Sequence, residues 1–69
     1  MEPHFVVTHI IFYSALNPGN LTLVECDDGS IRILRNERPV PGCVWESHQL
    51  EPAVQRFRAL VAQLGGAPN

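Results

Sequence analysis

The side chains that could bind a metal ion are few and lie far apart in the sequence. Five residues carry an imidazole or a thiol: His4, His9, Cys26, Cys43 and His48. None of them forms a Cys-x-x-Cys or His-x3-His pair, and His4 and His9 fall on opposite faces of a predicted strand because they are five residues apart. A zinc site would have to be assembled by tertiary contact alone. The sequence therefore predicts no metal and no cofactor.

The groups that could serve as nucleophiles also lack partners at a useful spacing. Ser14, Ser30 and Ser47 are not part of a nucleophile elbow, and the sequence places no acid or base near them or near the thiols. Asp27 and Asp28 precede a glycine, where Asp is favoured for its hydrogen bonds to turn backbone. A chain of 69 residues also has little room for a deep pocket beside its core. We expect a non-enzyme, with a metal- or thiol-dependent enzyme as a distant alternative.

The two cysteines leave a disulfide open as an alternative. A bridge between Cys26 and Cys43 would close a loop of roughly 17 residues and add about 3 kcal/mol in the entropic model. The N-terminus lacks the basic region of a signal peptide, and the apolar run over residues 5–15 is too short to span a bilayer. The default location is cytoplasmic, where both thiols are expected to be reduced.

Composition and charge favour a small globular domain that binds protein. Hydrophobic residues make up 45% of the chain, and the net charge is −2, with Arg as the only strong cation. A nucleic-acid-binding protein normally shows a basic excess, which this chain lacks. A single domain of this size has a marginal core and leaves apolar side chains at its surface. That surplus favours a homodimer or a standing protein partner, and it leaves nucleic acid as a less favoured partner.

Turn residues predict a β-hairpin in the middle of the chain. Asp28-Gly29 separates two runs rich in β-branched and aliphatic residues, at 21–26 and 31–36. This turn sets a register for the two strands. The predicted cross-strand pairs are Cys26 with Ile31, Glu25 with Arg32, Val24 with Ile33, and Leu23 with Leu34.

A long first strand and a short fourth one complete the predicted sheet. Residues 5–15 are apolar on both faces, which favours a strand covered on both sides and central in its sheet. Asn17-Pro18-Gly19-Asn20 predicts a type II turn into the next strand, with Tyr13 opposite Val24. Pro39, Pro41 and Gly42 should exclude a regular ladder. A short edge strand over residues 43–46 could follow.

The C-terminal third predicts an amphipathic helix over residues 50–64. Pro52 fits the first helical turn, and Gly65-Gly66 fits the helix end, before a tail over residues 65–69. The apolar stripe at three- and four-residue spacing consists of Val54, Phe57, Leu60, Val61 and Leu64. One helix can cover only one face of the predicted sheet. Which face stays open is not fixed by the sequence.

Five residues are candidates for partner binding: Arg32, Arg35, Arg38, Val40 and Trp45. The three arginines lie on or beside one strand and could meet an acidic surface. Val40 lies in a proline-rich segment that could protrude as an extended loop. Trp45, the only tryptophan, could be either a core anchor or an exposed hot spot.

The layout of the chain resembles that of several small phage and mobile-element proteins. It consists of a strand, a hairpin and a further strand, followed by Trp45-Glu46-Ser47-His48-Gln49-Leu50-Glu51 and an amphipathic helix. Anti-CRISPR proteins with a β-meander and a C-terminal helix are among the proteins it resembles. The resemblance implies a non-catalytic inhibitor that occupies the surface of a host protein.

Taken together, the patterns predict an α+β domain spanning residues 1–69. It consists of a three- to four-stranded antiparallel meander with one helix packed on one face. The predicted function is a dimeric protein-binding module that acts as an inhibitor or adaptor. The alternative is a transcriptional regulator that contacts nucleic acid through its sheet, with Arg32 and Arg35 as contacts.

Overall fold

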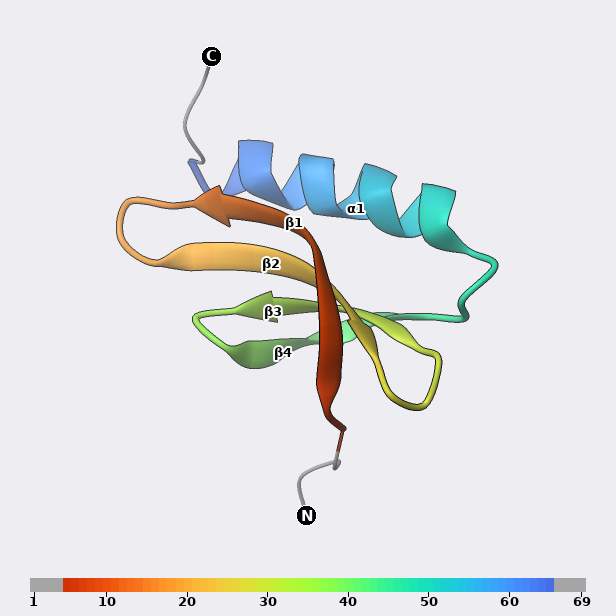
Figure 1. Ribbon diagram of the computed structural model, residues 1–69. Coiled ribbons are helices and arrows are strands. Elements are labelled where there is room, and N and C mark those ends of the chain that lie inside the picture. Colours follow the sequence, from red (N-terminus) through yellow and green to blue (C-terminus); the bar gives the residue numbers. More distant parts are fainter. Residues whose placement is uncertain (1–4, 66–69) are drawn as a thin grey trace.

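The computed structural model describes residues 5–65 and shows one sheet with one helix on it (Figure 1). The elements follow in the order β1 (Val7–Ala15), β2 (Asn20–Cys26), β3 (Ile31–Arg35), β4 (Arg38–Trp45) and α1 (Leu50–Gln63). All neighbouring strands are antiparallel, and their order in the sheet follows their order in the sequence. The predicted α+β meander with a C-terminal helix is confirmed.

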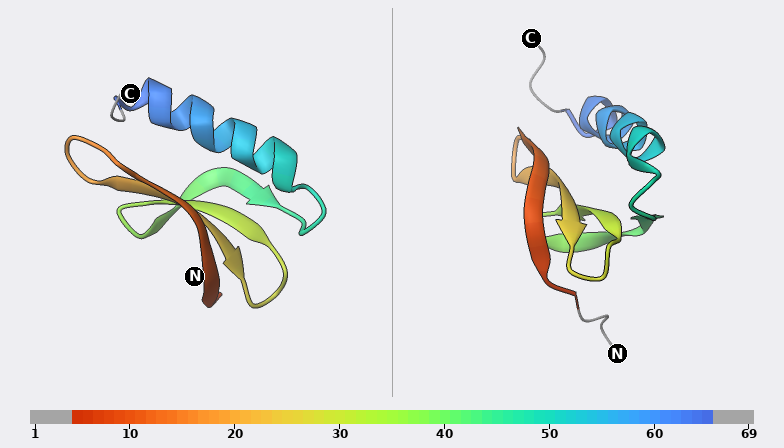
Figure 2. Two further views of the ribbon diagram at one scale, coloured as in Figure 1. Left: turned by 45° about the horizontal axis from the view of Figure 1, so that its top comes forward. Right: turned by 45° about the vertical axis from the view of Figure 1, so that its right-hand side comes forward.

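The main core lies between the sheet and α1, which packs over β2, β3 and β4 (Figure 2). Ala53 and Phe57 are the buried residues of α1, and the rest of the apolar stripe is partly buried beside them. The buried members of this cluster are Leu21, Leu23, Ile31, Ile33, Cys43, Ala53 and Phe57. Alternate residues of β2 and β3 reach this face because strand side chains point to opposite sides in turn.

The central hairpin forms where the sequence predicts it, but the predicted pairing was wrong by one residue. Its loop has three residues, because Gly29 N–H donates to Cys26 O at 3.0 Å and Cys26 N–H donates to Ser30 O at 2.9 Å. Gly29 has a φ of 83°, as in a hairpin whose tight turn is followed by a left-handed residue. Leu23 therefore lies opposite Ile33 rather than Leu34.

This shift moves side chains between the two faces of the sheet, as a one-residue change of register must. Leu23 and Ile33 share the helix-covered face with Leu21 and Ile31. The opposite face, called the open face below, carries a smaller buried cluster of Val24, Cys26 and Leu34. The predicted assignment had placed Val24 and Ile33 together on one face.

The first strand differs from its prediction in its position in the sheet and in its register. β1 lies at the edge of the sheet, so the prediction of a central strand was wrong. β1 pairs with β2 regularly from Ala15 opposite Asn20, which places Tyr13 opposite Thr22, not Val24, and two irregularities follow at residues 8 and 11. The Asn17–Pro18 peptide is cis, and Gly19 has a positive φ of 98°, as the predicted turn requires at this position.

The fourth strand is longer than predicted and begins at Arg38 instead of residue 43. Pro39 lies opposite Leu34, so proline did not prevent pairing at this position. The ladder is then interrupted, and regular pairing resumes with Val44 opposite Arg32. β4 is an edge strand, where a proline and a bulge are tolerated because one side of the backbone needs no partner.

The ends of the chain are described only in part. α1 ends at Gln63, one residue before the predicted end. Of the predicted tail, only residue 65 falls within the described part, and residues 66–69 lie outside it. Within residues 5–65, no helix has the length and apolar character needed to cross a membrane.

Candidate functional site

The chain itself closes part of the open face, although no helix covers it. Val24 and Cys26 are almost fully buried there, with Phe5 packed against their cluster. The guanidinium of Arg32 lies 4.7 Å from the centre of the Phe5 ring, in a cation–π arrangement. An uncovered second face was the basis for expecting a partner. Because this contact covers part of the second face, the candidates for partner binding are the apolar side chains that are still exposed.

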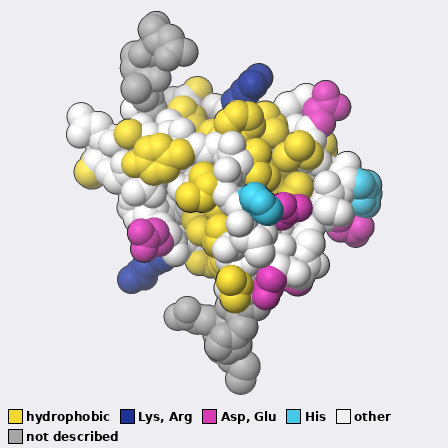
Figure 3. All heavy atoms as spheres, in the orientation of Figure 1, with side chains coloured by type: hydrophobic (Ala, Val, Ile, Leu, Met, Phe, Trp, Pro, Cys, Tyr) yellow, Lys and Arg dark blue, Asp and Glu magenta, His cyan; other side chains and the backbone are white. Residues whose placement is uncertain are grey.

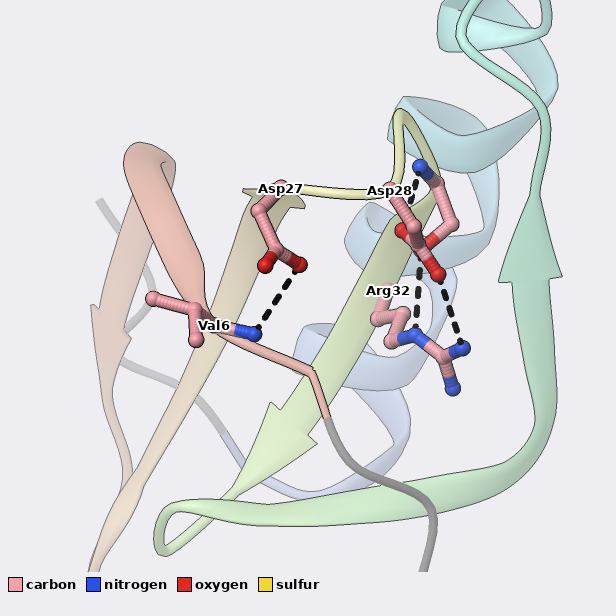
Figure 4. Close-up of polar contacts among 5 residues, drawn as sticks. Val6, Asp27, Asp28 and Arg32 are labelled. Carbon is pink, nitrogen blue, oxygen red and sulfur yellow. Dashed lines mark hydrogen bonds and ion pairs between the residues drawn. The ribbon is translucent and has the colours of Figure 1, made fainter.

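Arg32, the first of the predicted binding residues, is held by its own hairpin. Its Nε donates to Ser30 Oγ at 3.1 Å, and one terminal nitrogen lies 3.8 Å from Asp28 Oδ2 (Figure 4). Only 16% of the Arg32 side chain is exposed. Asp27, in the same turn, accepts a bond from Val6 N–H at 3.2 Å and so ties the start of β1 to this turn. Arg32 is therefore bound within its own hairpin and packed on Phe5 over the open face.

Hydrogen bonds from Ser30 hold the pKa of the Asp28 carboxyl below its usual range. The hydroxyl of Ser30 donates to Asp28 Oδ1 at 2.6 Å, the Ser30 N–H donates to it at 2.9 Å, and the Arg32 charge adds a smaller effect. Because the folded-state pKa is depressed, this stabilisation is complete above the usual Asp pKa of about 3.9. It is lost as the pH falls through the folded-state pKa.

The pH dependence gives a first prediction. We expect Ser30→Ala to make the acid-side loss of stability shallower than in the parent, because the hydroxyl is the largest cause of the lowered pKa of Asp28. Thermal midpoints measured between pH 7 and pH 2 test this, with Asp28→Asn as the control that removes the titrating group. Identical slopes for parent and Ser30→Ala below pH 4 would contradict the assignment.

The other predicted binding residues do not form one surface. Arg35 and Arg38 are exposed and lie opposite each other at the start of the β3–β4 turn. Val40 and Trp45 are only partly buried, and both pack against the cluster beneath α1. Trp45 therefore lies at the side of the core, at the other end of β4 from Arg38.

A shallow hollow lies between the β2–β3 turn and the segment that joins β4 to α1. Its volume is about 580 Å³, and its lining residues are Asp28, Gly29, Ser30, Val44, Trp45, Glu46, Ser47 and Gln49. The lining includes two carboxylates and two hydroxyls but no imidazole or thiol. The hydroxyl of Ser30 already donates to Asp28. Two of the polar side chains in the lining, Ser30 and Asp28, are therefore hydrogen-bonded to each other.

The cysteines do not meet. Cys26 belongs to the open-face cluster and Cys43 to the cluster under α1, and both thiols are free. The disulfide alternative is thereby ruled out for this fold. Burial raises the pKa of the Cys26 thiol, which keeps it protonated and unreactive. Over residues 5–65, no three side chains of the His, Cys, Asp and Glu types gather as metal ligands would.

Most of the exposed large apolar side chains in the described part lie along the edge strand β1, which sequence reasoning missed as a site. Five of the seven large hydrophobic side chains exposed in the described part lie in β1 or just before it: Val6, Val7, Ile10, Phe12 and Tyr13. Figure 3 shows a broad hydrophobic area over the region where β1 runs in Figure 1. We call these five residues the β1 edge patch.

The β1 edge patch wraps around both faces of the sheet. Ile10 and Tyr13 lie on the open face, since they are opposite Val24 and Thr22. Phe12 lies on the helix side, where its ring stacks on Phe57 with the centroids 6.1 Å apart. A segment added beside β1 would meet apolar side chains on both of its faces.

The two edges of the sheet differ in how they are protected against pairing. The β4 edge contains Pro39, Pro41 and Gly42, which interrupt a regular row of backbone donors. The β1 edge has no proline, and its only ionisable side chains are His9, 3.3 Å from Glu25, and Tyr13. Natural proteins usually block an exposed edge strand with charge or proline. β1 lacks both.

A comparison of the chain with protein-family models, curated proteins and solved structures finds no match.

Proposed function

We propose that this chain is a small non-catalytic protein-binding module that acts as an inhibitor or adaptor in the cytoplasm. Its protein-binding surface is the β1 edge patch. A second copy of the chain and a different protein are the two partners that this surface suits. The single observation behind the proposal is the concentration of exposed apolar side chains along one edge strand that has no proline and no Asp, Glu, Lys or Arg.

Two physical effects favour protein binding at this edge. An edge strand presents unpaired N–H and C=O groups, which an extended segment of another protein can satisfy by adding a strand to the sheet. Burial of apolar surface adds about 25 cal/mol for each Å² removed from water. Ile10 and Tyr13 are 65% and 62% exposed, so a partner strand would remove much of their surface from solvent.

The layout supports an inhibitor as the more specific form of the proposal. A meander followed by one helix resembles anti-CRISPR proteins encoded by phages, and such inhibitors act by occupying a surface of their target. The exposed Arg35 and Arg38, at the opposite end of β4 from the hollow, stay available for an acidic target.

Capture with matched variants tests the proposal. We expect the tagged parent chain to retain a protein partner, either an untagged second copy or a different protein, that tagged Ile10→Lys does not retain. Leu50→Lys is the control, because Leu50 is an exposed apolar residue (43% exposed) outside the β1 edge patch. The same retained proteins with Ile10→Lys as with the parent would contradict the proposal.

A further inference from the structure

The geometry points to a second copy of this chain as the partner of the β1 edge, paired antiparallel with the two-fold axis beside Tyr13. This inference rests on the proposed function, because it names the partner of the same surface. The two sheets would join into one sheet of eight strands. An antiparallel pair is related by an axis perpendicular to the sheet, so both α1 helices would lie on the same face.

Backbone hydrogen bonds around the first turn show which residues of β1 face the free edge. Leu16 N–H donates to Gly19 O at 2.8 Å, and Asn36 N–H donates to Asn20 O at 3.1 Å. Asn20 therefore points its carbonyl toward β3. Because hydrogen-bonded and non-hydrogen-bonded pairs alternate in an antiparallel ladder, Ser14 faces β2, whereas Tyr13 and Ala15 direct their N–H and C=O groups outward.

Pairing about Tyr13 would use these outward groups symmetrically. Each Tyr13 would exchange two backbone hydrogen bonds with Tyr13 of the second copy. The pairing of β1 with β2 is regular over residues 12–15, beyond the irregularities at residues 8 and 11, so the outward backbone groups of this stretch alternate as a further ladder requires. The two exposed Tyr13 side chains would lie side by side on the open face, and each Phe12 would lie next to Ser14 of the other copy.

The lack of charged residues along β1 and the interrupted edge at β4 also favour a second copy as the partner. Residues 5–16 contain no Asp, Glu, Lys or Arg, so two copies of this segment meet without like-charge repulsion. α1 packs over β2, β3 and β4 and leaves the β1 edge accessible. The β4 edge is interrupted, so the joined sheet would stop at two copies instead of growing into a fibre.

The area that the proposed interface can bury indicates the dissociation constant to expect. A standard interface takes about 800 Å² from each partner, which is about one-sixth of the 4951 Å² accessible surface of this chain. Pairing through one strand and a few apolar side chains falls at the lower end of that class. We therefore expect a dissociation constant on the order of micromolar.

Two measurements test the inference. Sedimentation of the parent chain should show a dimer at high micromolar concentration, and Tyr13→Lys should be monomeric because it places two ammonium groups at the axis. Directly opposed hydrogen-bonded residues lie about 5.5 Å apart between Cα atoms, within disulfide range. Tyr13→Cys should therefore form a covalent dimer on mild oxidation. Gln55→Cys, exposed on α1, is the control and should not.

The outcomes separate this inference from the proposed function. A parent chain that is monomeric at high micromolar concentration overturns the second copy, whereas capture of a different protein that depends on Ile10 would still support protein binding at the edge. A dimer that persists in Tyr13→Lys, or equal crosslinking of the two cysteine variants, places the interface elsewhere and also overturns the inference. Native Cys26 and Cys43 are buried and do not compete in the crosslinking.

Discussion

Phe57→Ala is expected to lower the free energy of unfolding by about 3–5 kcal/mol. Phe57 is 6% exposed, belongs to the cluster between α1 and the sheet, and is one of the two buried residues of α1. A domain of 69 residues has a total stability of about 3–10 kcal/mol. Loss of this ring should therefore leave a large unfolded fraction at 25 °C, which circular dichroism and urea titration would measure.

Phe12→Ala is the matched control for this effect. The two rings stack on each other, but Phe12 is 43% exposed at the edge of the sheet. We expect Phe12→Ala to cost about 1–2 kcal/mol, because a half-exposed ring loses only part of its burial. Equal costs for the two substitutions would show that α1 is not anchored through Phe57.

Leu23→Ala is expected to cost about 2–5 kcal/mol. Leu23 is fully buried, and the observed register places it opposite Ile33 beneath α1. Removing three carbon atoms there leaves a cavity between the strand and the helix. Urea denaturation of the parent and the variant would give the difference in their free energies of unfolding, provided that both show the same dependence of that free energy on urea concentration.

Thr22→Ala is the neighbouring control that reports on the register. Thr22 points to the open face, next to Tyr13 and Leu34, and is only partly buried. Its substitution should change the free energy of unfolding by less than about 1 kcal/mol. Comparable losses for Leu23→Ala and Thr22→Ala would contradict the assignment of alternate β2 residues to opposite faces.

The elements of the fold could be predicted from the sequence because local signals are strong there. The stripe that includes Val54 and Phe57 has helical spacing, and Asp28-Gly29 marks a turn between two runs of β-formers. The register could not be predicted in the same way. Loops of two and three residues are both compatible with Asp27-Asp28-Gly29, and the choice between them decides which alternate side chains enter the core.

The candidate site was missed because one pattern has two physical explanations. An apolar strand such as residues 5–15 can be covered on both faces in the middle of a sheet, or it can lie at an edge where its side chains are exposed. The order of the elements contained the missing signal. In a meander of consecutive neighbours, the first strand must lie at an edge, so its apolar faces indicated an exposed surface and not a covered one.

The predicted binding residues illustrate a different limit. Arg32 is charged and lies on a strand, which suggests a free surface group. Its partners Ser30 and Asp28 come from the same hairpin, and Phe5 reaches it from before β1. No local pattern encodes this last contact, because it depends on how the start of the chain crosses the open face.

Amide hydrogen exchange along β1 tests the central claim most directly. Tyr13 and Ala15 direct their N–H groups to the free edge, whereas Ser14 faces β2. We expect exchange at Tyr13 and Ala15 to slow sharply between low and high micromolar protein, or on addition of a captured partner, while Ser14 is protected throughout. Fast exchange at Tyr13 and Ala15 under all of these conditions would contradict the claim that proteins bind at the β1 edge.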